Sequence, residues 1–156
     1  MLPLTVVLVI AAAAVGTLAG LGGYTFVYAK GGSYLSEDSA ACVNCHIMRP
    51  QFEGWVRSSH REAASCNDCH TPDGLLDHWI VKAENGWNHS YAFTTGDFPE
   101  PIRITDRNHA VTEAACRRCH GELVAQTDAL TREHREADEV SCTRCHRSVG
   151  HAHATD

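Results

Sequence analysis

The first 29 residues of the 156-residue chain contain no Asp, Glu, Lys or Arg. From Leu4 to Val27 the sequence is almost wholly apolar, and as a helix it would extend roughly 36 Å, long enough to cross a bilayer with some tilt. A cleavable signal peptide would have a basic region followed by a shorter apolar stretch, and this segment has neither. We therefore predict an uncleaved transmembrane anchor over residues 1–29.

The remaining residues, 30–156, lack an excess of positive charge. They carry all 19 acidic and 13 basic side chains of the chain, and the net charge of −6 argues against nucleic acid as a partner. Neither flank of the apolar segment is clearly rich in Lys or Arg, so charge alone does not orient it. Within that segment Gly16 and Gly20 form a GxxxG pattern, which would allow a homodimer of two such helices; the alternative is a small-residue face without a partner.

The sequence has no cysteine outside C-x-x-C pairs, which leaves none for a separate disulfide framework. Each of the four pairs is followed at once by a histidine, the signature of c-type haem attachment, in which two thioethers hold the porphyrin. Zinc ribbons also use paired C-x-x-C motifs, but zinc binding does not explain the same histidine after every pair. The predicted haem-binding cysteines are Cys42, Cys45, Cys66, Cys69, Cys116, Cys119, Cys142 and Cys145.

Residues 30–156 are also poor in aliphatic side chains for a domain of this size, so side chains alone would form a thin core. Four covalently bound haem c groups would fill the interior. We therefore predict a mainly α, haem-packed multihaem cytochrome c of short helices and loops, with one N-terminal transmembrane helix. Because haem c is attached outside the cytoplasmic membrane, the haem domain is predicted to lie on the periplasmic or exterior side.

The motifs begin at intervals of 24, 50 and 26 residues, which suggests two dihaem units, about 40–71 and 114–151, joined by an interfacial segment 72–113. A histidine lies 18 residues after the first cysteine of each unit, His60 in the first and His134 in the second. Duplication of one dihaem unit would explain this agreement, and chance is the alternative in a chain with 11 histidines.

Four irons need up to eight axial ligands. The motif histidines His46, His70, His120 and His146 are the default proximal set. A low-spin electron-transfer haem generally takes a second strong ligand, so several other histidines are expected to be distal ligands. These candidates are His60, His78, His89, His109, His134, His151 and His153.

The central segment 72–93 has apolar residues at intervals of three and four, the pattern of an amphipathic helix with a weak point at Gly86. On the same helical wheel His78, Lys82, Asn85 and His89 would form one polar stripe. Tryptophan favours the bilayer–water interface, so the tryptophans of this region favour a helix lying on the membrane, with its stripe at quinone depth. Residues 94–108 are predicted to be an extended loop.

The anchor, the four CxxCH motifs and the extended first motif CVNCHIM, which places Met48 two residues after His46, resemble the NapC/NirT family of membrane quinol dehydrogenases. The lysine in IVKAENGWNHSY and the closing CTRCHRSVGH carry the same resemblance, which covers essentially the whole chain. It is strongest to members that deliver electrons to periplasmic pentahaem cytochrome c nitrite reductase.

The resemblance implies that Met48 binds the first iron in place of His46 and leaves the opposite face for quinol. Taken alone, the sequence also allows an alternative, in which His46 ligates the iron and Met48 packs on the porphyrin. It implies that Lys82 belongs to the quinol site. His89 stands where some members have Asp, and would either accept a proton or close off the first iron.

The resemblance further implies that His60 is the distal ligand of the fourth haem and His151 that of the third. The second haem takes a lysine from the partner reductase in some members. In this chain the repeat offers His134 instead, and the two alternatives stay open.

The implied function is oxidation of menaquinol and delivery of its electrons to the nitrite reductase, which converts nitrite to ammonia. Two alternatives remain: a general quinol dehydrogenase serving nitrate reductase or several acceptors, and a tethered electron shuttle with four saturated haems and no quinol site. Nitrite reduction by the chain itself is disfavoured, because the sequence has no C-x-x-C-K motif for the usual catalytic haem.

Overall fold

The computed structural model describes residues 2–131 and 141–151. The chain divides into two compact units, Met1–Ser36 and Glu37–Asp156. The described residues are helical and contain no β-strand, which confirms the predicted mainly α class.

The first unit consists of one long helix and a short 3₁₀ turn. Helix α1 spans Leu4–Tyr28, 25 residues and about 37 Å. It contains no charged residue, and it is long and apolar enough to cross a membrane, as the sequence predicts. It ends where Lys30 takes the left-handed conformation (φ 51°), and η1 (Gly31–Leu35) follows.

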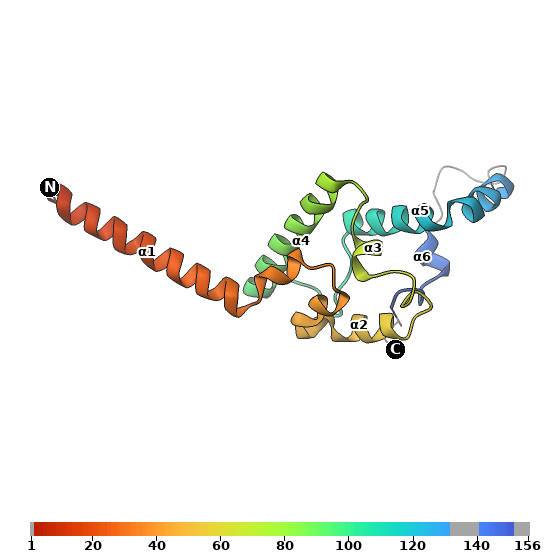
Figure 1. Cartoon of the computed structure of the whole chain (residues 1–156), viewed down its shortest axis with the longest axis horizontal. Helices are drawn as coiled ribbons and strands as arrows, with labels where there is room; N and C mark the ends of the chain where they lie inside the picture. The colour runs from red at the N-terminus through yellow and green to blue at the C-terminus, as the bar shows by residue number, and fades with distance from the viewer. Residues whose placement is uncertain (1, 132–140, 152–156) are drawn as a thin grey trace. The chain divides into compact units, whose positions relative to one another are not determined.

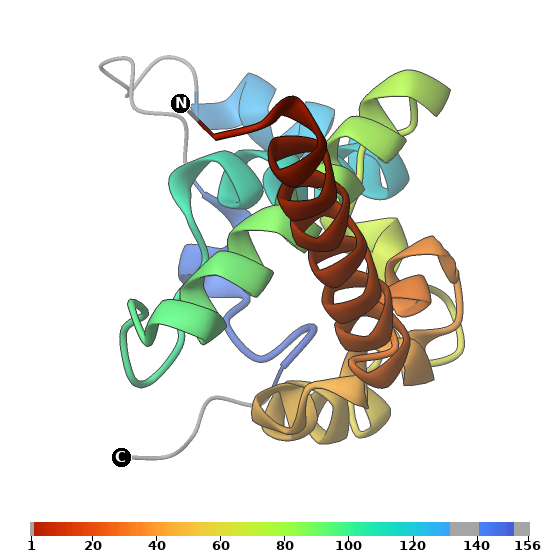
Figure 2. The same ribbon diagram turned by 90° about the vertical axis from the view of Figure 1, so that its left-hand side faces the viewer.

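The second unit is a chain of short helical segments around two longer helices (Figure 1). Its elements are η2 (Ser39–Asn44), η3 (His46–Met48), α2 (Arg49–Val56), α3 (Cys66–His70), α4 (Leu75–Thr95), α5 (Asp106–Thr131) and α6 (Cys142–Cys145). Helix α3 packs against α5, and both views show them side by side (Figures 1 and 2). The sequence did not predict α5, which carries the third motif and departs from helical geometry at His120 (φ −108°, ψ 19°).

The apolar core is thin, as the composition predicts. Among the described residues only Val81 and Ala115 are buried apolar side chains, and no large side chain is fully buried. Three polar residues, Ser39, Thr71 and Lys82, are as buried as these two. A domain of this length normally buries many aliphatic side chains. These residues are therefore arranged as a shell that needs a large apolar group inside it.

Helix α4 exposes most of the apolar side chains that a helix of a soluble protein would turn toward the core. Its apolar side chains are exposed (Leu75, Leu76, Trp79, Ile80, Trp87, Tyr91 and Phe93), whereas Lys82 in its polar stripe is only 6 % exposed. The helix continues through Gly86, the predicted weak point, and ends at Gly96 in the left-handed conformation (φ 74°). The following loop is shorter than predicted, because α5 already begins at Asp106.

Candidate functional site

The second and fourth CxxCH motifs begin on helical turns, α3 and α6, whose first N–H groups have acceptors. In the second motif Ser65 and Asp68 form a capping box: the Ser65 N–H donates to the Asp68 carboxylate (2.7 Å), and the Asp68 N–H donates to the Ser65 hydroxyl (3.4 Å). The Cys66 N–H donates to the hydroxyl of buried Ser39 (3.1 Å), which joins the second motif to the first. Such caps are typically worth about 1 kcal/mol each. The motifs are thus held in place by the chain itself.

The cysteine sulfurs of the two dihaem units are paired in the same way. A hydrogen bond joins the Cys42 and Cys66 thiols, and another joins Cys116 and Cys142, so in each unit the first cysteines of its two motifs are neighbours. In the thiol form the shared hydrogen bond raises the pKa of Cys42 and lowers that of Cys66 to about 6. This repeated arrangement supports the predicted duplication.

The cysteines do not gather as zinc ligands. All eight are free of disulfides, and the described ranges hold no cluster of three or more His, Cys, Asp or Glu side chains suited to a bare metal ion. Helical CxxCH turns around a thin apolar core instead fit a covalently attached planar group.

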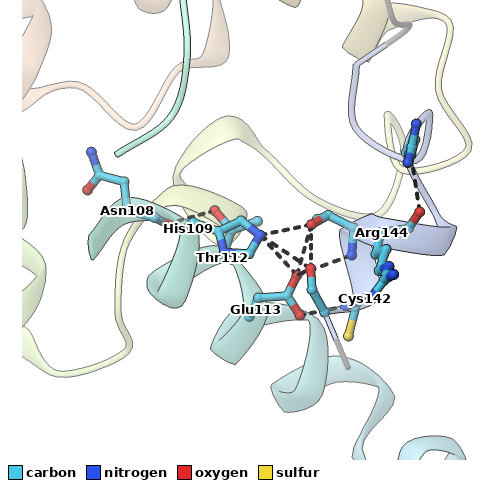
Figure 3. Close-up of polar contacts among 9 residues, drawn as sticks. Asn108, His109, Thr112, Glu113, Cys142 and Arg144 are labelled. Carbon is cyan, nitrogen blue, oxygen red and sulfur yellow. Dashed lines mark hydrogen bonds and ion pairs between the residues drawn. The ribbon is translucent and has the colours of Figure 1, made fainter. Parts of the chain in front are cut away.

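The fourth motif depends on one carboxylate, Glu113 of α5 (Figure 3). Glu113 accepts hydrogen bonds from the N–H of Cys142 (2.7 Å), the N–H of Thr143 (3.1 Å) and the hydroxyl of Ser141 (2.7 Å). Desolvation acts to raise the pKa of Glu113, but these hydrogen bonds outweigh it and lower the pKa to about 2. Nε2 of His109 lies 2.9 Å from the Thr143 hydroxyl, within the same group of side chains.

Two pairs of predicted axial ligands lie close together, one stacked and one edge to face. The rings of His70 and His151 have centroids 6.0 Å apart and planes 25° apart. The rings of His60 and His120 are also 6.0 Å apart, with planes at 72°. Desolvation lowers the pKa of His70 to about 4, which keeps its imidazole neutral, the form that binds iron.

The other predicted ligands are less constrained. In the first motif His46 is exposed, whereas Met48 is half-buried at the end of its 3₁₀ turn. His146 of the fourth motif is exposed, and His134 and His153 lie outside the described residues.

The first part of the predicted polar stripe of α4, His78 and Lys82, points into the domain, whereas His89 is exposed. The Lys82 ammonium donates to the Glu37 carboxylate at 2.7 Å and lies 5.2 Å from the centre of the Trp79 ring. His78 Nε2 lies 3.2 Å from the same Glu37 oxygen, and the Lys82 hydrogen bond is the main reason that the pKa of Glu37 is lowered. Two turns away His89 is more exposed, and partial desolvation lowers its pKa. His89 is therefore neutral near pH 7 and able to accept a proton.

Comparison with known proteins gives the family directly. Residues 3–156 match the model of the NapC/NirT cytochrome c family, N-terminal region. The chain belongs to the NapC/NirT family.

Two curated members of the NapC/NirT family are close relatives. The chain is 41 % identical over 137 residues to the cytochrome c-type protein NrfH of Wolinella succinogenes, covering 81 % of this chain and 77 % of the relative. It is 34 % identical over 110 residues to the cytochrome c nitrite reductase subunit NrfH of Nitratidesulfovibrio vulgaris, covering 70 % and 65 %. In structure it matches a chain of the cytochrome c nitrite reductase NrfHA complex bound to the inhibitor HQNO, with a TM-score of 0.64, 30 % identity and coverage of 96 % and 93 %.

Membership of the NapC/NirT cytochrome c family supports covalently bound haem c, and the four CxxCH motifs fit four such groups. Sequence reasoning singles out the cysteines and histidines by their spacing and Lys82 by the resemblance, and their roles stay predictions. It missed Glu37 and Glu113, because an isolated carboxylate carries no pattern. Only their hydrogen bonds identify them. Glu37 bonds to Lys82, 45 residues along the chain, and Glu113 bonds to Cys142, 29 residues along the chain.

Proposed function

We propose that this membrane-anchored tetrahaem cytochrome oxidises menaquinol at the membrane surface and delivers the electrons to a periplasmic cytochrome c nitrite reductase, which reduces nitrite to ammonia. The observation that carries the proposal is Lys82, a cation 6 % exposed on the inner face of α4 and held by Glu37. A buried ammonium is costly unless it is paired and used, so its position favours a role toward a polar ligand. The NrfH relatives, named as nitrite reductase subunits, support the partner.

The exposure of α4 supports a quinol site at the membrane. Its aromatic and aliphatic side chains face outward, and Trp79 and Trp87 are 41 % and 72 % exposed. Tryptophan is enriched at the bilayer–water interface, and an exposed apolar helix face of this size calls for a lipid or protein surface. With that face on the bilayer, α4 would lie at the depth of the membrane surface, where the head group of a quinol is found.

Lys82, His89 and Glu37 would each have a separate role in quinol oxidation. Lys82 donates a hydrogen bond to a quinol oxygen and favours its loss of a proton, because a nearby cation stabilises the oxyanion. His89, neutral at pH 7, accepts a proton. Glu37 is a positioning residue that fixes the Lys82 ammonium. Oxidation of one quinol to quinone releases two protons toward the periplasm and two electrons.

The haems, when bound, accept these electrons one at a time and pass them on. Met48 would ligate the first iron, a role that its half-buried position beside exposed His46 supports. A thioether raises the potential of a haem relative to a second imidazole, which favours electron entry there.

Extraction from native membranes in mild detergent tests the partner. We expect a larger multihaem subunit to copurify and the preparation to reduce nitrite with menaquinol as donor. A chain that comes out alone, yet is still reduced by menaquinol, would instead be a general quinol dehydrogenase with exchangeable acceptors. A chain that menaquinol does not reduce would be a tethered electron shuttle.

Glu37→Gln tests the positioning role. The variant removes the charge that holds Lys82, and we expect quinol-driven haem reduction to slow about tenfold, the order of one charge-assisted hydrogen bond. The dependence of the rate on quinol concentration should also change, because the Lys82 ammonium loses the carboxylate that positions it. Stopped-flow reduction at several quinol concentrations measures both effects. Glu53→Gln, at an exposed carboxylate of α2, is the matched control, and equal rates in the two variants would remove Glu37 from the site.

A further inference from the structure

A second histidine, His78, lies beside the Lys82 ammonium. His78 precedes Lys82 by four residues on α4, and side chains at this spacing share a face of the helix. Its Nε2 lies 3.2 Å from Oε1 of Glu37, and the same oxygen accepts the hydrogen bond of the Lys82 ammonium at 2.7 Å. The imidazole and the ammonium are therefore neighbours around one carboxylate oxygen.

The Glu37 carboxylate is held at both of its oxygens. Oε2 accepts a hydrogen bond from the side-chain amide of Asn67, inside the second CxxCH motif, at 2.7 Å. The hydrogen bond from Lys82 is the main reason that the pKa of Glu37 is lowered, so this carboxylate is ionised at pH 7. An ionised carboxylate can only accept hydrogen bonds. In neutral His78 the proton therefore lies on Nε2, and Nδ1 keeps its lone pair.

A carboxylate behind one nitrogen of an imidazole prepares the other nitrogen to act as a base. It fixes the tautomer and the orientation of the ring, and it stabilises the imidazolium that forms when the ring takes up a proton. The ring of Trp79 lies edge to face with that of His78, with centroids 5.3 Å apart. The His78 side chain is 21 % exposed, against 7 % for Lys82, so a proton taken up beside the buried ammonium has a way to water.

We infer that His78 accepts the proton of the quinol hydroxyl that Lys82 binds. This inference rests on the proposed function and names a further residue of its site. The O–H bond of that hydroxyl breaks, the proton passes to Nδ1 of His78, and the bonding pair stays on the oxygen, where Lys82 stabilises the negative charge. The proton of the other hydroxyl goes to His89. Two electrons then leave the ring, which becomes the quinone, and the His78 imidazolium releases its proton to periplasmic water.

The position of His78 suits this hydroxyl better than the position of His89. A general base must come within hydrogen-bond reach of the proton that it takes, directly or through one water. His89 is seven residues from Lys82, roughly 10 Å along the helix. His78 and Lys82 contact the same Glu37 oxygen, so both can meet one quinol oxygen. Two histidines then serve the two hydroxyls of one quinol.

His78→Gln in the full-length, haem-loaded chain in detergent tests the inference. The glutamine amide can still donate a hydrogen bond to Glu37, but it cannot take up a proton. We expect menaquinol-driven haem reduction at saturating quinol to slow about 10²-fold, the lower end of what a general base contributes. The solvent deuterium isotope effect on the remaining rate should increase, because proton transfer then limits it. Reduction by dithionite should be unchanged.

His78→Ala gives a second measurement, which also decides if His78→Gln does not accumulate. We expect the same loss of rate, and partial recovery when 2-methylimidazole is added as a free base, since its methyl group hinders binding to iron. Asp77→Asn, at an exposed carboxylate one residue earlier on α4, is the matched control. It should keep the rate of the unsubstituted chain and show no response to the base.

An unchanged quinol-driven rate in His78→Gln, or an equal loss in Asp77→Asn, would overturn the inference. A haem that turns high-spin in His78→Gln would also overturn it, because His78 would then be an iron ligand. Failure of the proposed function looks different. In that case menaquinol would leave the haems of the unsubstituted chain oxidised, before any variant is compared.

Discussion

Replacing Lys82 with methionine is expected to slow menaquinol-driven haem reduction by at least about 10²-fold, because a charge-assisted hydrogen bond to the reacting oxygen is worth about 3 kcal/mol in a desolvated site. Methionine has an apolar side chain of similar length but no ammonium, the group that lies 5.2 Å from the centre of the Trp79 ring. Reduction by dithionite, which does not use the quinol site, should be unchanged. Stopped-flow spectra of the haem bands measure both rates on the same preparation.

Lys30→Met is the matched control, since Lys30 is the other lysine of the chain and lies outside α4. It should keep the quinol-driven rate of the unsubstituted protein. Equal losses in both variants would mean that net charge matters and position does not, and an unaffected Lys82→Met protein would remove Lys82 from catalysis.

Replacing Glu113 with alanine should destabilise the domain by about 3 kcal/mol, because two buried N–H groups and a hydroxyl lose a charged acceptor. The same figure follows from its titration. The pKa of Glu113 is about 2 in the folded chain against an ordinary 4.5, a difference equivalent to about 3 kcal/mol. The stabilisation is therefore complete above pH 4.5 and is lost as the pH falls from there toward 2. Acid unfolding of the haem-loaded protein, followed by the haem absorption, measures the midpoint.

In the Glu113 variant the fourth motif should loosen first. The free energy of unfolding should also lose most of its pH dependence between pH 4.5 and 2. Glu122→Gln, at an exposed carboxylate later on α5, provides the comparison and should unfold like the unsubstituted chain. If Glu113→Ala matched that control, the hydrogen bonds to Cys142 and Thr143 would contribute nothing to the anchoring of α6.

The sequence predicts those parts of the molecule that show a helical period of apolar residues or a regular spacing of motifs. The anchor, the haem motifs and the helix through Lys82 can all be read from local patterns, and the structure places the helices close to where those patterns lie. The spacing also groups the motifs in pairs, and the structure pairs Cys42 with Cys66 and Cys116 with Cys142.

What the sequence does not predict is which distant residues meet. The helical period of α4 shows that one face is apolar and the other polar. It does not show which face points into the domain, because the period is the same whether the apolar face meets protein or lipid. Glu37 and Glu113 act through contacts that span 45 and 29 residues. Spacing likewise gives a list of candidate iron ligands but does not assign each of them to a haem.

The most direct test of the account is to mix the purified tetrahaem chain, free of any reductase, with a menaquinol analogue under anaerobic conditions. The account predicts rapid reduction of its haems with one quinol consumed for every two electrons gained, and a loss of this reaction in Lys82→Met. Haems that dithionite reduces fully but menaquinol leaves oxidised would contradict it.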